Sequence, residues 1–238
     1  MAGHPYKRIL LKISGESLSH EGQLGIEPET LMVTAQEIVD VARCGVQVAV
    51  VVGGGNLIRG EKLARSGKIQ RATADYMGML GTVMNALALQ DALEALGQPA
   101  RVVSAIAIAA VCEPFVRRRV IRHLEKNRVV ILAAGTGNPF VTTDTCATLR
   151  AAEIGADIVM KATKVDGVYD SDPKLNPAAK RYEKLTYADV LRDNLRVMDM
   201  TAISMAMEQK MPILVFNVKQ PGNIMRAIAG EPVGTLVS

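Results

Sequence analysis

A run of five apolar residues that leads straight into three glycines constrains this chain more than any other stretch. Four of the residues in Val48–Val52 are valine, which favours a strand buried on both faces. Gly53–Gly55 tolerate positive φ and place no Cβ in the way of a ligand. We expect Asn56 to cap a helix that starts at Leu57. This arrangement points free N–H groups and the helix dipole at one spot, so it predicts a phosphate cradle. A tight turn without a ligand is the alternative, and Arg59 beside the turn favours phosphate.

Two other stretches repeat the pattern of a strand followed by a turn. The strand Arg8–Ser14 ends at Gly15, and the strand Arg128–Ala134 leads into Gly135–Thr143 and then a helix. In a parallel sheet the C-terminal ends of the strands meet at one edge, where open α/β sheets bind their ligands. We therefore expect the three turns to lie close together.

Lone cations accompany these strand ends. Lys12 lies in the first strand, and Lys161 lies near the end of the strand Ile158–Ala162. Together with Arg59 they bring positive charge to the expected ligand edge. A lysine on an edge strand is the alternative for Lys12.

Strands alternate with helical segments along the whole chain. The expected helices are Pro28–Arg43, Ala72–Leu96, one starting at Pro114, Thr143–Ile154, one from Asp199 to Lys210 and one from Pro221-Gly222 to Ala229. Such alternation predicts an α/β fold, with a mainly parallel central sheet between two layers of helices. No change in composition divides the sequence, so we expect a single domain over residues 1–238.

Several residues in these elements suggest a specific structural or functional role. Asp75, expected in the first turn of its helix, either compensates the helix dipole or binds ligand hydroxyls. Gly78 and Gly81 lower helix propensity, so a close neighbour is expected to pack there. Asp166-Gly167 predicts a hairpin turn. A basic cluster favours a solvated or subunit-contact face over a regulatory anion site; its members are Arg117, Arg118, Arg119, Arg122 and His123.

Composition excludes several classes of function. The net charge of +4 and the pI of about 9.0 suit anionic small molecules but are weak for nucleic-acid binding, and Trp is absent. Cys44, Cys112 and Cys146 form neither a zinc pattern nor a disulfide framework. With no signal-peptide core and no apolar run long enough for a membrane, we expect a cytoplasmic location.

Phosphate cradles and mobile cations without a clear nucleophile–base pair fit phosphoryl transfer, which depends on positioning and charge neutralisation. No GKS, GKT or G-x-G-x-x-G follows a glycine turn, so the pattern predicts a kinase outside the P-loop class.

Five segments in order carry a family resemblance: KRILLKISGE, VVVGGGNLIRG, DYMGML, AGTGNPFVTTD and KATKVDGVYDSDP. They resemble the bacterial UMP kinases of the amino acid kinase superfamily over nearly the whole chain. The resemblance implies the amino acid kinase fold and transfer of the ATP γ-phosphate to UMP with Mg²⁺. It also implies a homohexamer that UTP inhibits.

The resemblance also implies roles for single residues. Those that match catalytic residues are Lys12, Asp144 and Lys161, with the aspartate orienting the lysines. Those that match ATP contacts are Lys12, Ile13, Ser14, Gly15, Gly55, Arg59, Thr163, Tyr169 and Asp172. Those that match UMP contacts are Gly54, Asp75, Thr136, Gly137, Asn138, Pro139, Phe140, Val141, Thr142 and Thr143.

The segment His20–Gly25 aligns with one linked to GTP activation in some relatives; it comprises His20, Glu21, Gly22, Gln23, Leu24 and Gly25. It is the least similar part, and an exposed loop histidine is the alternative for His20. No direct protein ligand for Mg²⁺ is expected. A sister kinase with another small acceptor and a nucleotide-binding regulator without turnover are the competing functions.

Overall fold

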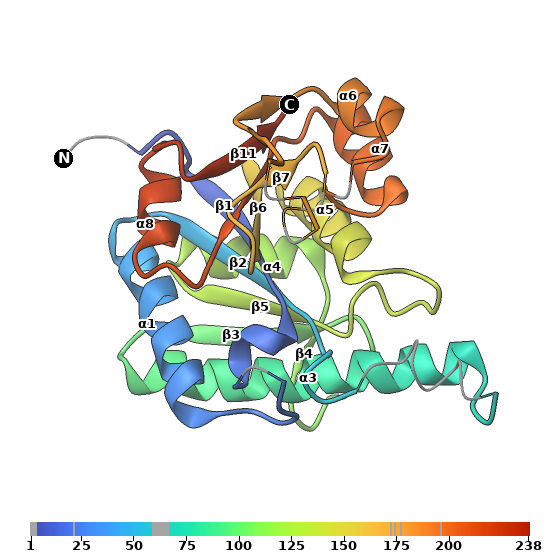
Figure 1. Cartoon of the computed structure of the whole chain (residues 1–238). Helices are drawn as coiled ribbons and strands as arrows, with labels where there is room; N and C mark the ends of the chain where they lie inside the picture. The colour runs from blue at the N-terminus through green and yellow to red at the C-terminus, as the bar shows by residue number, and fades with distance from the viewer. Residues whose placement is uncertain are drawn as a thin grey trace.

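The architecture was analysed in a computed structural model that describes residues 4–20, 22–58, 67–171, 173, 175–176, 178–195 and 197–238. Nine strands form one sheet in the order β4-β3-β5-β2-β1-β6-β10-β11-β9 (Figure 1). All neighbours in it run parallel except β10 and β11. The strands are β1 (Arg8–Ile13), β2 (Gln47–Val52), β3 (Ala100–Ser104), β4 (Glu113–Pro114), β5 (Val129–Ala133), β6 (Ile158–Thr163), β9 (Lys184–Leu185), β10 (Ile213–Asn217) and β11 (Gly234–Val237).

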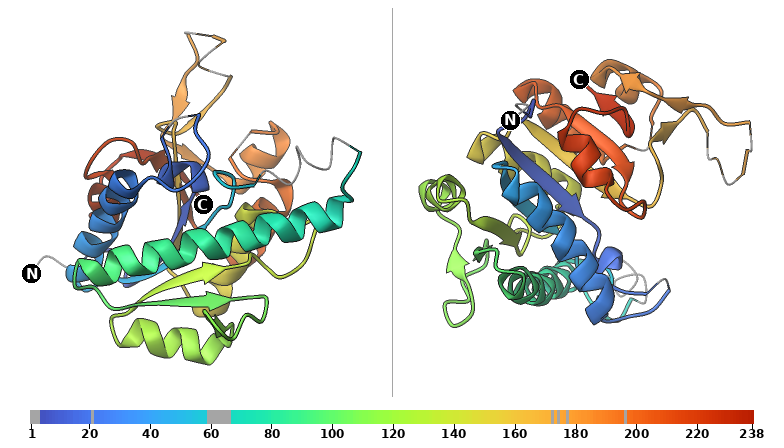
Figure 2. Two further views of the ribbon diagram at one scale, coloured as in Figure 1. Left: turned by 90° about the horizontal axis from the view of Figure 1, so that it is seen from below. Right: turned by 90° about the vertical axis from the view of Figure 1, so that its left-hand side faces the viewer.

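Helices cover both faces of the sheet and make the three expected layers (Figure 2). One face packs against α1 (Pro28–Arg43), α3 (Arg71–Ala95) and α8 (Asn223–Ile228). The other packs against α4 (Arg117–Glu125), α5 (Thr143–Ile154), α6 (Tyr187–Arg192) and α7 (Met200–Gln209). The predicted α/β sandwich with a mainly parallel sheet is therefore confirmed. Among the helices in the described part of the chain, none has the length and hydropathy needed to cross a bilayer.

The alternation of side chains in β1 decides where Lys12 lies. Ile9, Leu11 and Ile13 belong to the core under α1 and α3, whereas Leu10 belongs to the core under α5. Because side chains alternate along a strand, Lys12 lies on the same face of β1 as Leu10, and its side chain extends toward α5. Because β1 is flanked by β2 and β6, the edge-strand interpretation of Lys12 is wrong.

Two local predictions differ from the structure. The helix expected at Pro114 begins at Arg117, since Phe115 N–H bonds to the Ser104 carbonyl (2.9 Å) and Pro114 stays in β4. Asp166-Gly167 is not a two-residue hairpin turn; instead β7 (Val168–Tyr169) pairs with β8 (Arg181–Tyr182) in a small separate sheet.

The Asn56 side chain takes part in contacts that its sequence context does not indicate. Residues 55–57 form a turn, and the buried Asn56 amide bonds to the Gly25 carbonyl (2.8 Å) and exchanges hydrogen bonds with Asn85 of α3. The helix expected after Leu57 falls largely on residues 59–66, which lie outside the described residues.

The predicted close neighbour of Gly78 and Gly81 is the glycine turn after β2. A Cβ on Gly54 would stand 2.6 Å from the Gly78 carbonyl oxygen and 3.1 Å from the Thr82 nitrogen, whereas one on Gly55 would meet nothing within 4 Å. We expect Gly54→Ala to lower the free energy of unfolding by about 1–3 kcal/mol, because helix backbone must move. Gly55→Ala is the matched control in urea denaturation, and equal losses for the two variants would contradict this account.

Candidate active site

Lys12, Asp144 and Lys161 meet at the C-terminal edge of the sheet. Lys12 Nζ lies 3.1 Å from Asp144 Oδ1, and Lys161 Nζ donates to Asp144 Oδ2 at 2.7 Å. All three side chains are mostly buried. One carboxylate thus holds two ammonium groups side by side.

The fold explains this convergence. Lys12 and Lys161 are direct partners in the register of β1 and β6. Asp144 is the second residue of α5, whose N-terminus is capped by Thr142 Oγ1 accepting from the N–H groups of Asp144 and Thr145. The Val197 carbonyl accepts a second hydrogen bond from Lys161 Nζ at 2.7 Å.

Burial and neighbouring charges shift the pKa values of Asp144 and Lys161 in this cluster. Burial raises the pKa of Asp144, but the charges of Lys12 and Lys161 outweigh it and hold that pKa below its ordinary value. Burial lowers the pKa of Lys161, although Asp144 opposes the shift. Lys12 faces Asp144 Oδ1 as an ion pair, and this buried oxygen accepts no hydrogen bond within the described structure. Lys161 has a second acceptor in the Val197 carbonyl, whereas Lys12 forms its ion pair with Asp144.

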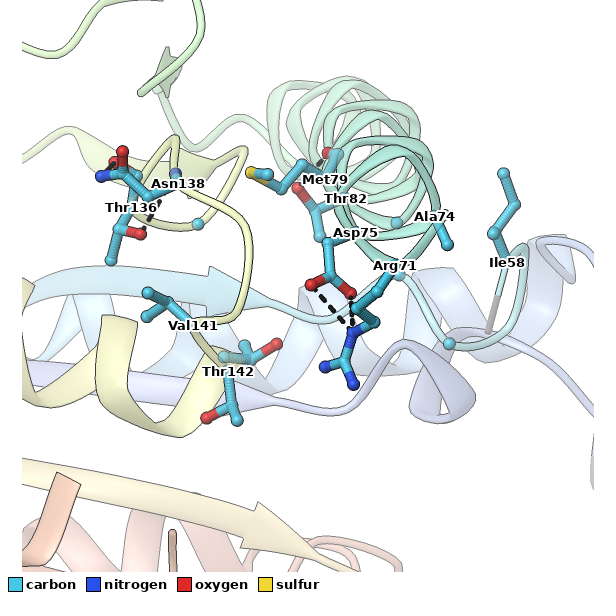
Figure 3. Close-up of a pocket in the computed structure, with 15 residues that line it drawn as sticks. Ile58, Arg71, Ala74, Asp75, Met79, Thr82, Thr136, Asn138, Val141 and Thr142 are labelled. Carbon is cyan, nitrogen blue, oxygen red and sulfur yellow. Dashed lines mark hydrogen bonds and ion pairs between the residues drawn. The ribbon is translucent and has the colours of Figure 1, made fainter. Parts of the chain in front are cut away.

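A cavity of about 300 Å³ opens beside this cluster, and we call it the glycine-loop cavity (Figure 3). It is lined by Gly54, Gly55, Ile58, Arg71, Ala74, Asp75, Gly78, Met79, Thr82, Gly135, Thr136, Asn138, Val141, Thr142 and Thr143. The structure thus gathers most of the residues matched to UMP contacts around one space. Gly55, matched to ATP, lines the same cavity.

Asp75 links α3 to the loop after β5, and these two segments line opposite sides of the cavity. Its carboxylate accepts from Arg71 Nε at 2.8 and 3.0 Å and from the Phe140 N–H at 2.9 Å. Asp75 is the fifth residue of α3, and no acidic residue stands in the first turn. Dipole compensation therefore does not explain Asp75, and its carboxylate faces the cavity (Figure 3).

The loop after β5 holds an unusual backbone. Ala134 and Phe140 have φ of 59° and 66°, in the left-handed region that non-glycine residues rarely adopt. Thr82 Oγ1 accepts from the Ala134 N–H (2.8 Å), and the buried Arg150 donates to the Gly135 carbonyl (3.3 Å). Helices α3 and α5 thus fix the loop in a shape it would not adopt alone.

A second cavity of about 450 Å³, the hairpin cavity, lies next to β7. Its lining includes Tyr169, Asp170 and the segment 193–195. Thr163, at the end of β6, is not among its lining residues and lies beside Asn217. Arg59 and Asp172, both matched to ATP contacts, lie outside the described residues.

Gly25, the last residue of the segment expected to respond to GTP, is hydrogen-bonded to the glycine turn. The Gly25 N–H donates to the Asn56 carbonyl at 2.9 Å, and Asn56 returns a hydrogen bond to Gly25. His20 lines a third cavity of about 340 Å³ together with Glu16, Glu27, Glu29 and Glu37. Glu21 lies outside the described residues.

The sequence pattern does not indicate the contacts that some residues make near the site. Asp199, expected only as a helix start, caps α7 and also accepts from Thr142 Oγ1 and Thr145 Oγ1, so it links α7 to the start of α5. Thr82 and Arg150 lie inside helices whose periodicity predicts only packing. Their partners are backbone groups distant in sequence, and no local pattern reports such contacts.

Comparison with known proteins places this geometry in a family. The model of the amino acid kinase family matches residues 7–217. A UMP kinase of Bacillus anthracis is 42% identical, with a TM-score of 0.95, 98% of this chain covered and 96% of the other. A UMP kinase of Ureaplasma parvum is 39% identical, with a TM-score of 0.93 and 98% of each chain covered. A uridylate kinase of Archaeoglobus fulgidus is 33% identical, with a TM-score of 0.73 and coverages of 97% and 99%. Since the family model matches most of the sequence, the chain belongs to the amino acid kinase family.

Proposed function

We propose that the protein is a UMP kinase, which transfers the γ-phosphoryl group of ATP to UMP and gives UDP and ADP. The observation that carries this proposal is the Lys12–Asp144–Lys161 cluster, whose neighbours along the chain line the glycine-loop cavity and the hairpin cavity. Thr143, next to Asp144, lines the glycine-loop cavity. Leu195, two residues before the Val197 carbonyl that binds Lys161, lines the hairpin cavity. The similar UMP kinases support the choice of acceptor.

In this proposal the two substrates approach the cluster from opposite sides. UMP occupies the glycine-loop cavity, with Asp75 on the ribose hydroxyls and residues 136–143 around the base. ATP occupies the hairpin cavity, with Tyr169 beside the nucleoside and Lys12–Gly15 at the phosphates. Residues 1–238 form a single domain; the acceptor site comes mostly from its N-terminal part plus 136–143, and the ATP site mostly from its C-terminal part.

The chemistry requires charge stabilisation rather than a general base, because the UMP phosphate is already ionised at neutral pH. Lysines act as compact, mobile charges, so Lys12 and Lys161 follow negative charge from the donor to the acceptor phosphate. Asp144 keeps the two lysines side by side.

Mg²⁺ is proposed to arrive with ATP. Within the described residues no group of three His, Cys, Asp or Glu side chains stands ready to hold a metal. Phosphate oxygens and water are suitable ligands for this ion, which neutralises phosphate charge when bound. The protein's own residues position the nucleotides and supply the lysine charges.

The proposal is tested by coupled ADP release with ATP and Mg²⁺, comparing UMP, CMP, AMP and dUMP as acceptors. A strong preference for UMP is the expected result. ATP binding without turnover on any nucleotide would favour a regulator, and turnover on a different small acceptor would favour a sister kinase.

Asp75→Asn is expected to raise KM for UMP about tenfold and to leave kcat within a few-fold, since a neutral amide accepts more weakly from ribose hydroxyls. Steady-state kinetics with UMP varied at saturating ATP measure this. Asp91→Asn, an exposed position on the same helix, is the matched control. A UMP affinity that is unchanged in Asp75→Asn would remove Asp75 from the acceptor site.

We further propose that UTP inhibits the enzyme, that GTP activates it through His20–Gly25, and that it is a cytoplasmic homohexamer. The Gly25–Asn56 hydrogen bonds support a link from this segment to the glycine turn. Four glutamates against two lysines, Lys164 and Lys219, give the cavity at His20 a net negative lining, which disfavours a triphosphate there. Initial rates with and without each effector, and sedimentation velocity, test these points.

A further inference from the structure

Arg71 is a charged side chain of the glycine-loop cavity to which the sequence pattern gives no role. Its Nε donates to both oxygens of Asp75. A guanidinium has five N–H donors, so the two terminal amino groups keep four. In Figure 3 the guanidinium extends from α3 into the cavity, with its terminal nitrogens pointing away from Asp75.

Helix stability does not explain an arginine at this position. Arg71 is the first residue of the 25-residue α3, where the positive end of the helix dipole disfavours a cation. An arginine four residues before an acid is also the weaker orientation of such a pair. The Arg71 side chain is 48% exposed, and ion pairs at that exposure contribute little to stability.

The charge of the cavity suggests what Arg71 does. Of the described residues that line it, Arg71 and Asp75 are the charged ones, and their charges cancel. A nucleoside monophosphate brings a phosphate that is largely dianionic at neutral pH. The planar fork of a guanidinium matches phosphate oxygens in a bidentate way. Across the cavity, the start of α5 and the glycine turn present further donors to the same anion.

We propose that Arg71 binds the phosphate of the acceptor nucleotide through its terminal amino groups, while its Nε keeps Asp75 oriented for the ribose hydroxyls. This inference rests on the proposed UMP kinase function. One side chain then recognises the phosphate directly and the ribose through Asp75. Arg71 thereby favours a nucleoside monophosphate over the nucleoside.

The test compares UMP with uridine, which shares base and ribose but lacks the phosphate. Arg71→Gln is expected to raise KM for UMP about 10- to 100-fold, the loss expected for a charge-assisted hydrogen bond. The inhibition constant of uridine against UMP is expected to rise by a much smaller factor, because Asp75 loses one orienting partner but keeps the Phe140 N–H, and KM for ATP is expected to stay unchanged. Arg71→Lys keeps a point charge without the fork, so it recovers part of the UMP affinity.

Two comparisons sharpen the result. Asp75→Asn is expected to weaken both UMP and uridine, because it removes a ribose contact that the two ligands share. Arg226→Gln, on α8 and outside the cavity, is the control for loss of an exposed, ion-paired arginine. Equal weakening of UMP and uridine by Arg71→Gln, or an unchanged KM for UMP, would overturn the inference. A wild-type enzyme without turnover on UMP would instead overturn the proposed function, so the two failures are distinguishable.

Discussion

Replacing Lys12 with alanine is expected to lower kcat by about 10²-fold or more, as loss of a donor that acts in the transition state does. Lys12 Nζ lies 3.1 Å from Asp144 Oδ1 at the C-terminal edge of the sheet, next to the start of α5. A lysine is a compact charge on a flexible stem, so in the proposed reaction Lys12 follows the phosphoryl group as charge moves from donor to acceptor. KM for UMP is expected to change little, because the groups that line the glycine-loop cavity remain.

The variant is also expected to fold. Asp144 keeps its hydrogen bond from Lys161, so no buried anion is left without a partner. Rapid-quench or coupled steady-state kinetics at saturating ATP and UMP measure the loss, with thermal unfolding as the check on folding. Lys7→Ala, an exposed lysine just before β1, is the control. A kcat near that of the wild-type enzyme in folded Lys12→Ala would exclude Lys12 from the transition state.

The sequence predicted the convergence of the strand ends and of the two lysines at one edge of the sheet. Unbroken apolar runs marked the buried strands, and their turns marked the ligand edge. A parallel pairing of β1 with β6 is enough to bring Lys12 beside Lys161, as the register confirms. The cap at Thr142 then places Asp144 at the start of α5.

The parts that could not be predicted depend on contacts between distant segments. Pro114 favoured a helix start, but pairing with β3 keeps it in a strand. The hydrogen bonds of the Asn56 side chain with Gly25 and Asn85 join segments far apart in sequence, so no local pattern indicates them. The sequence pattern places Arg71 in a polar loop. In the structure α3 begins at Arg71, and its side chain is hydrogen-bonded to Asp75.

The second large effect is expected for Asp144→Asn, which changes the group that both lysines share. An amide has one oxygen in place of two carboxylate oxygens, so one ammonium group loses its acceptor. The two buried lysines then face each other without a counter charge. The expected fall in kcat is about 10³-fold, because the charges of both lysines proposed to act in catalysis are displaced. Lys12→Ala in the same assays gives the reference for losing one lysine.

Stability is expected to fall as well. Removing one partner of a buried ion pair typically costs about 3–5 kcal/mol, since a buried charge remains uncompensated. Urea denaturation at neutral pH measures the difference in the free energy of unfolding between wild type and Asp144→Asn. Asp91→Asn, exposed on α3, is the control, and a loss no larger than in that control would contradict the role of Asp144 as the shared counter charge.

The pH dependence separates a lost charge from a simple packing defect. The pKa of Asp144 in the folded protein lies below its ordinary value, because Lys12 and Lys161 outweigh the effect of burial. Its stabilising contribution is therefore complete above the unfolded-state pKa of about 3.9 and disappears as the pH falls through the folded-state value. The wild type should consequently lose more stability than Asp144→Asn when urea denaturation is repeated at progressively lower pH. The difference in the free energy of unfolding between the two proteins could instead stay constant down to the acid transition. The aspartate would then stabilise the fold by its shape, and the lysines would need another counter charge.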